Sequence, residues 1–176
     1  PTPTPPAYAP PMPAHLIRRF RPDDAAATRA VFHAAVRIGA AGHYPEADLI
    51  DWSPSPEPSP DWGPWLNSHF TVVSEDAARV TGFFMIEADG YLNMAFVLPD
   101  YRGTGLADRL YQAILAEARR LTLTRMTVVA SRLARPFFAR RGWRIDPGYV
   151  PRPGIPTLSA DGGPLNHGMV LDPVTP

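Results

Sequence analysis

Residues 97–107 read Val-Leu-Pro-Asp-Tyr-Arg-Gly-Thr-Gly-Leu-Ala, a strand end followed by a glycine-bearing turn and the start of a helix. Gly103 and Gly105 allow the main chain to approach a ligand closely. The first N–H groups of the following helix lack intrahelical partners, and the helix dipole favours an anion beside them. The segment therefore predicts a pyrophosphate site, although a ligand-free strand-to-helix connection would show the same glycine spacing.

Strands and helices are expected on both sides of this turn. Period-two patterns and turn residues predict strands at 15–21, 69–74, 79–88, 91–98 and 125–130, with weaker strands at 149–158 and 167–171. Apolar stripes at helical spacing predict helices at 25–38, 45–52, 106–121 and 132–141. The middle strands form an antiparallel meander, and a strand-loop-helix-strand crossover follows it, so the fold class is α+β.

Length and composition limit the number of domains and the kinds of catalytic and metal site that are possible. The 176 residues predict one globular domain over 15–176, preceded by a disordered Pro-rich arm at 1–14. The chain has no Cys and no Lys, which excludes disulfides, thiolate metal sites, Cys nucleophiles and Schiff bases. No metal site is expected. The sequence contains no apolar run of about 18 residues, so no membrane span is expected and the default location is the cytoplasm.

The zero net charge conceals an uneven distribution. Residues 101–144 carry ten Arg against Asp108 and Glu117, whereas residues 1–100 carry twelve acids against six Arg. Such asymmetry can indicate nucleic-acid binding. Because the basic segment 101–144 also contains the glycine-bearing turn, a compact polyanionic ligand is the more specific interpretation. No nucleic-acid partner is expected.

Three separated segments carry a family resemblance. Arg102-x-x-Gly105-x-Ala107 resembles the (Gln/Arg)-x-x-Gly-x-(Gly/Ala) signature of the GNAT superfamily of N-acetyltransferases. The segments 19–24 and 131–143 resemble the family's first strand and helix cap and its later Asn-x-x-Ala-x-x-aromatic-Tyr-x-x-x-Gly-Phe stretch. The resemblance implies a mixed, mostly antiparallel twisted sheet of six to seven strands, flanked by about four helices, with a V-shaped cleft where two central strands splay apart.

The resemblance also implies acetyl-CoA as cosubstrate and assigns residues to it. Backbone of Phe96 and Val97 would bind the pantetheine arm, and Val97 would polarise the thioester carbonyl. Arg102 and the Arg-rich surface would meet the 3′-phosphate, while Ser131 would either bind the pantetheine arm or act as a plain helix N-cap. The cofactor set is completed by Phe138 and by the pyrophosphate-binding amides of Gly103, Thr104, Gly105, Leu106 and Ala107.

Acetyl transfer by direct attack needs no enzyme nucleophile, which agrees with a chain lacking Cys and Lys. In many relatives a Tyr protonates the departing thiolate, and here that position is Phe138. The thiolate would leave assisted by the helix N-terminus and water, or a hydroxyl of Tyr111 or Tyr149 would reach it. The alternative is a GNAT-fold module that binds or senses acyl-CoA without catalysis.

The acceptor is expected to be a primary amine of a small molecule or peptide. The candidate contacts, His43, Tyr44, Glu46 and Trp52, fall in a long loop region rich in Pro and Trp, where a binding lid is expected. Acidic residues around this lid suggest a cationic amine steered by the electric field. A monomer or a homodimer is expected.

Overall fold

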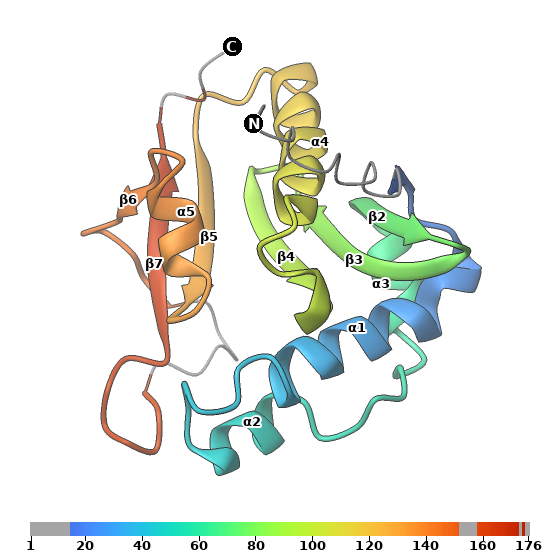
Figure 1. Ribbon diagram of the computed structural model, residues 1–176. Helices are drawn as coiled ribbons and strands as arrows, with labels where there is room; N and C mark the ends of the chain where they lie inside the picture. The colour runs from blue at the N-terminus through green and yellow to red at the C-terminus, as the bar shows by residue number, and fades with distance from the viewer. Residues whose placement is uncertain (1–14, 152–157, 173, 175–176) are drawn as a thin grey trace, which may run out of the picture.

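The computed structural model describes residues 15–151, 158–172 and 174, and Figure 1 shows the arrangement of the elements. A seven-stranded sheet has the order β1-β2-β3-β4-β5-β7-β6, and every neighbouring pair is antiparallel except β4 and β5. The strands are β1 (Leu16–Arg19), β2 (Phe70–Asp76), β3 (Arg79–Ile86), β4 (Tyr91–Val97), β5 (Met126–Ser131), β6 (Arg144–Ile145) and β7 (Asn166–Leu171). The predicted α+β fold with a mixed, mostly antiparallel sheet is confirmed.

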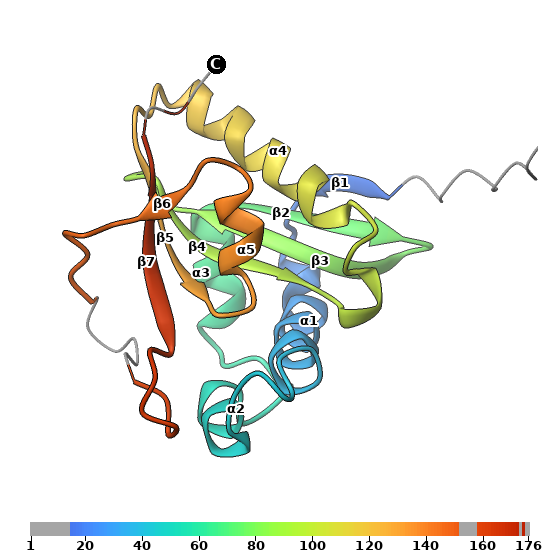
Figure 2. The same cartoon turned by 60° about the vertical axis from the view of Figure 1, so that its left-hand side comes forward.

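Helices cover both faces of the sheet. They are α1 (Ala25–Arg37), α2 (Glu46–Trp52), α3 (Trp62–Ser68), α4 (Leu106–Arg120) and α5 (Arg135–Ala139), with short 3-10 turns at Pro22–Asp24 and Pro99–Tyr101. Figure 2 shows α4 and α1 on opposite sides of the sheet. Five helices are therefore described where about four were expected.

Strand β3 divides the core into two clusters because its side chains alternate between the two faces. Phe84 and Ile86 pack with α4, whereas Phe83 and Met85 pack on the side of α1. The predicted stripe of α4 faces the first cluster, with Leu106, Leu110 and Ile114 all buried. Burial of this stripe fixes α4, and with it the turn before α4, against the sheet.

Two element predictions are wrong. Residues 62–68 form a helix where only a Pro-rich loop was expected, because Pro64 lies in the first turn, where its missing N–H costs nothing. The indole N–H of Trp62 donates to Thr28 Oγ1 at 3.1 Å and ties this helix to α1. Trp62 therefore anchors this part of the chain on the domain.

The predicted strand at 149–158 is not formed by its described residues. Residues 149–151 are irregular, Leu158 makes an isolated bridge to Pro164, and 152–157 lie outside the described residues. The edge of the sheet is instead β6. Proline cannot donate to a strand ladder, so Pro147 and Pro151 oppose strand pairing on either side of Tyr149. The predicted arm at 1–14 also lies outside the described residues.

Candidate active site

The sheet opens between β4 and β5. These parallel strands pair only at Tyr91 with Thr127 and at Leu92 with Val128. Beyond that point β4 stays paired with β3, and β5 stays paired with β7. The two strands therefore separate, as the resemblance implied. A cavity of about 260 Å³ lies at the opening, between Ala95, Phe96 and Val97 on one side and Ser131 on the other.

The separated edge of β4 presents backbone groups to this cavity. The N–H of Leu98 donates to Thr81 O at 2.8 Å, so it points toward β3. Because successive amides of a strand point to opposite edges, the N–H groups of Val97 and Ala95 point toward the cleft. The splay thus leaves a main-chain N–H at Val97 facing the cleft, at the residue to which the resemblance assigns the thioester carbonyl.

The glycine-bearing turn closes the neighbouring side of the cavity. Gly103 and Gly105 adopt φ of 74° and 85°, a left-handed conformation that residues with side chains rarely adopt. Arg109 is the first residue of α4 whose N–H finds a carbonyl in the turn, Gly105 O at 3.2 Å. Across 103–108, all of them described residues, the backbone N–H groups have no backbone acceptor. They form a cluster of donors at the positive end of α4.

The side chains around this cluster leave room for a ligand. A Cβ added at Gly103 or Gly105 would meet no atom within 4 Å. Gly103 and Ala107 line the cavity, whereas Leu106 is buried in the core. The Thr104 hydroxyl donates to Tyr101 O at 2.7 Å and stabilises the turn.

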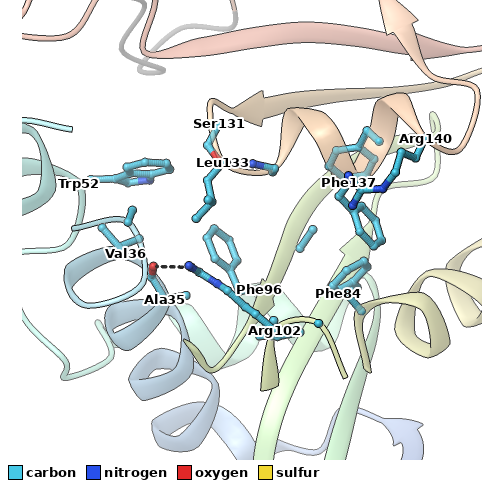
Figure 3. A pocket seen from close by; sticks show the side chains of 17 residues that line it. Ala35, Val36, Trp52, Phe84, Phe96, Arg102, Ser131, Leu133, Phe137 and Arg140 are labelled. Atoms are coloured by element: carbon cyan, nitrogen blue, oxygen red, sulfur yellow. Dashed lines mark hydrogen bonds between the residues drawn. The ribbon is translucent and has the colours of Figure 1, made fainter. Parts of the chain in front are cut away.

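Arg102 makes a contact that the sequence did not predict. Its guanidinium donates to Gly39 O and to Ala35 O at the C-terminal end of α1, instead of facing outward toward a phosphate. Figure 3 shows the side chain reaching toward Ala35 across the cavity. A Cβ at Gly39 would lie 2.1 Å from Arg102 Nη2, so this contact requires glycine there. Burial lowers the pKa of Arg102, and the helix dipole favours its charge.

Helix α5 supplies the other wall of the cavity. The Phe138 ring is buried and stacks edge-on against Phe137 and Trp143, with ring centres 5.2 Å apart in each case. Ser131 Oγ accepts from the N–H of Ala134 at 3.1 Å in the turn before α5, and Ala134, not Ser131, is the N-cap of that helix. Arg140 also lines this end of the cavity. The sequence indicated Arg140 only as one of ten Arg residues in the basic segment 101–144.

The two predicted tyrosine acids lie outside the cavity. The hydroxyl of Tyr111 accepts from the indole N–H of Trp143 at 2.8 Å, and burial raises its pKa. Tyr149 borders a second cavity of about 170 Å³, where its ring packs so closely over Gly168 that a Cβ there would lie 2.1 Å from Tyr149 Cγ. Packing therefore accounts for both residues, and neither contacts the opening between β4 and β5.

Of the four predicted acceptor contacts, Trp52 alone lines the cavity. The buried Tyr44 hydroxyl instead donates to Leu165 O at 3.0 Å and accepts from the N–H of Arg132 at 2.6 Å. Burial raises the pKa of Tyr44. His43 and Glu46 are exposed and do not border the cavity. Sequence reasoning missed Val36, Ala40 and Leu133, whose apolar side chains line the same end as Trp52.

The described residues omit 1–14, 152–157, 173, 175 and 176. They contain no group of three His, Asp or Glu side chains placed to hold a metal ion. None of their helices combines the length and apolar character needed to cross a membrane.

Comparison with known proteins places this geometry in a family. Residues 66–157 match the acetyltransferase (GNAT) domain family. An uncharacterised N-acetyltransferase of Escherichia coli (strain K12), YafP, is 30% identical over 128 residues, which span 73% of this chain and 80% of that protein.

Solved structures agree with the sequence comparison. The crystal structure of a GCN5-related N-acetyltransferase from Rhodopseudomonas palustris has a TM-score of 0.75 and 26% identity, covering 90% of this chain and 95% of that one. The PaiA N-acetyltransferase from Thermoplasma acidophilum, solved with coenzyme A, has a TM-score of 0.68 and 12% identity, covering 90% and 99%. At that identity the second likeness concerns the fold alone. The splayed strands, the glycine-bearing turn and the matched domain together lead to one conclusion: this chain belongs to the GNAT family of acetyltransferases.

Proposed function

We propose that the protein transfers the acetyl group of acetyl-CoA to a primary amine of a small molecule or peptide. The observation that carries the proposal is the meeting of two sets of main-chain donors at one cavity: the Val97 edge of β4 and the amides of the turn before α4. A structural relative of the same fold holds coenzyme A, which supports this choice of cofactor.

The turn is proposed to hold the pyrophosphate. Amides of Gly103 to Ala107 would donate to its oxygens, because they lack backbone acceptors within the described chain and lie at the positive end of α4. Arg140 would supply the cationic partner that Arg102 does not provide, since it also lines the cavity. Ala134 and Phe138 of the α5 wall would flank the pantetheine arm.

The transfer requires one bond to form and one to break. The neutral amine nitrogen attacks the thioester carbon, the carbonyl oxygen gains negative charge, and the carbon–sulfur bond breaks to release the CoA thiolate. The Val97 N–H would stabilise the oxyanion, because a preorganised donor at the position of developing charge lowers the barrier. The proton lost by the amine would pass to water.

The thiolate would leave without a tyrosine acid. Among the described residues that line the cavity, Ser131 alone carries a hydroxyl, and Phe138 occupies the position of the relatives' tyrosine. A thiolate is a far better leaving group than an alkoxide, so water would suffice to stabilise it while the amides at the α4 N-terminus hold the pyrophosphate. The same Phe138 motivates a second candidate function, acyl-CoA binding without turnover.

An amine panel separates these two functions. Free thiol released from acetyl-CoA would be followed with each amine, and CoA affinity would be measured by calorimetric titration. Thiol release that depends on the amine supports transfer. Tight CoA binding with no turnover across the panel would support the binding module, and failure to bind CoA would contradict both functions.

Introducing the missing hydroxyl tests the account of the leaving group. In Phe138→Tyr we expect CoA affinity within about twofold of wild type and a several-fold rise in turnover. The rise should stay below the roughly 10²–10⁴-fold that a general acid usually contributes, because water already stabilises the departing thiolate in the wild type. Thiol-release rates at saturating acetyl-CoA measure it.

Phe20→Tyr is the matched control, because it adds the same hydroxyl to a buried ring outside the cavity and should leave turnover unchanged. A large loss of CoA affinity in Phe138→Tyr alone would show that Phe138 does not lie beside the thiol end.

A further inference from the structure

The end of the cavity opposite Arg140 is apolar. It is formed by Val36 and Ala40 at the end of α1, Trp52 at the end of α2, and Leu133 after β5. In Figure 3, Trp52 and Val36 lie on the opposite side of the cavity from Phe137 and Arg140. If CoA enters along the turn and α5, as proposed above, this end is where the acceptor meets the thioester.

The charge at this end is positive. Arg102 is the charged side chain that reaches it, and no Asp, Glu or His occurs among the described residues that line the cavity. An acceptor therefore finds a guanidinium and no carboxylate at the end where its amine must react. That arrangement opposes any acceptor that brings a second positive charge.

The acidic residues of the lid are directed elsewhere. The Asp48 carboxylate accepts from the N–H of Ala160 at 3.1 Å and from the Ser159 hydroxyl, so it braces the loop before β7. Glu46 and Asp51 are exposed and do not line the cavity. The cationic acceptor suggested by the charge of the first half of the chain has no matching carboxylate in the site.

We infer that the acceptor is a monoamine whose amino group is attached to an apolar alkyl or aryl group, and that diamines and polyamines are excluded. The inference rests on the proposed acetyl transfer. Burying a second ammonium beside Arg102 without a carboxylate is costly. Burying an apolar group against Trp52 and Leu133 is favourable in proportion to the area removed from water. Selectivity thus combines an attraction with a repulsion.

A matched pair of amines tests this inference. Pentylamine and 1,5-diaminopentane share one carbon chain and differ by the second amino group. We expect kcat/KM for pentylamine to exceed that for the diamine by at least about tenfold, since a site that must bury an unpaired polar group discriminates strongly. Binding of each amine to the protein saturated with CoA, measured by calorimetry, gives a second readout that needs no turnover.

The two readouts separate this inference from the proposed function. Preferential binding of pentylamine without turnover would support the apolar acceptor end and contradict the catalysis. Equal or stronger binding and turnover of the diamine would overturn the inference and leave acetyl transfer intact. Failure of both amines to bind the CoA complex would also overturn it.

Substitution of Trp52 tests whether this residue causes the preference for apolar amines. With 2-phenylethylamine as acceptor, Trp52→Ala should lower kcat/KM about tenfold and leave the affinity for CoA unchanged, whereas Trp52→Phe should retain most of the rate. Ile50→Ala is the control, because Ile50 belongs to the same helix, is exposed and does not line the cavity. An unchanged kcat/KM in folded Trp52→Ala would contradict the assignment.

Discussion

Gly105→Glu is expected to weaken CoA binding by at least tenfold while the domain remains folded. A Cβ at this position meets no protein atom within 4 Å, so the new side chain would extend into the space that the pyrophosphate is proposed to occupy. Its carboxylate would also repel the phosphates and compete for the amides at the start of α4. Calorimetric titration with CoA measures the loss.

The backbone conformation adds a cost that has to be separated from the loss of binding. Gly105 has φ of 85°, and a residue with a side chain in this region costs about 1–3 kcal/mol of stability. Gly162→Glu is the matched control, because Gly162 has φ of 78° and equally open surroundings but lies in the loop before β7, away from the turn that precedes α4. It should lose comparable stability and keep its affinity. Undiminished affinity in folded Gly105→Glu would refute the pyrophosphate assignment.

Asp24→Ala is expected to reduce the free energy of unfolding by about 3 kcal/mol, because removing one partner of a buried ion pair leaves the charge of the other only partly compensated. Both oxygens of Asp24 accept from Arg18, at 2.7 and 2.9 Å, and the Arg21 N–H donates to the same carboxylate at 2.7 Å. Arg18 would keep Glu75 at 2.8 Å as its acidic partner, and it would still donate to Arg19 O at 3.1 Å. The contact joins β1 to the start of α1, the helix that forms one wall of the cavity.

The pH dependence of this loss gives an independent check. Burial alone would raise the pKa of Asp24, but hydrogen bonds from Arg18 and Arg21 outweigh burial and lower it. The carboxylate therefore stabilises the fold fully at neutral pH, and that contribution disappears as the pH falls through the lowered pKa. Urea unfolding should show the difference between wild type and Asp24→Ala shrinking in acid. The exposed Asp23→Ala is the control, and an equal loss there would contradict the account.

The sequence predicted those features that depend on local pattern. The stripe of α4 and the glycines before it follow from helical spacing and from the conformational freedom of glycine, so both appear where expected. The splay between β4 and β5 was implied by the family resemblance. These features fix the path proposed for CoA.

The contacts that the sequence could not predict join distant segments. Arg102 reaches carbonyls at the end of α1 because Gly39, 63 positions earlier in the chain, leaves space for it. Tyr111 was a candidate acid by its residue type, but its hydroxyl accepts a hydrogen bond from Trp143, which lies 32 residues later in the chain. The acidic lid suggested a cationic acceptor, yet the orientation of Asp48 depends on a loop more than 100 residues later. Residue type alone carries none of this information.

A crystal structure of the protein with bound CoA tests the central claim most directly. We predict diphosphate oxygens within about 3 Å of the backbone nitrogens of residues 103–107, the ordinary range for such hydrogen bonds, and the sulfur beside the Val97 edge of β4. Coenzyme A bound away from the opening between β4 and β5, with the amides of that turn facing solvent, would contradict the account.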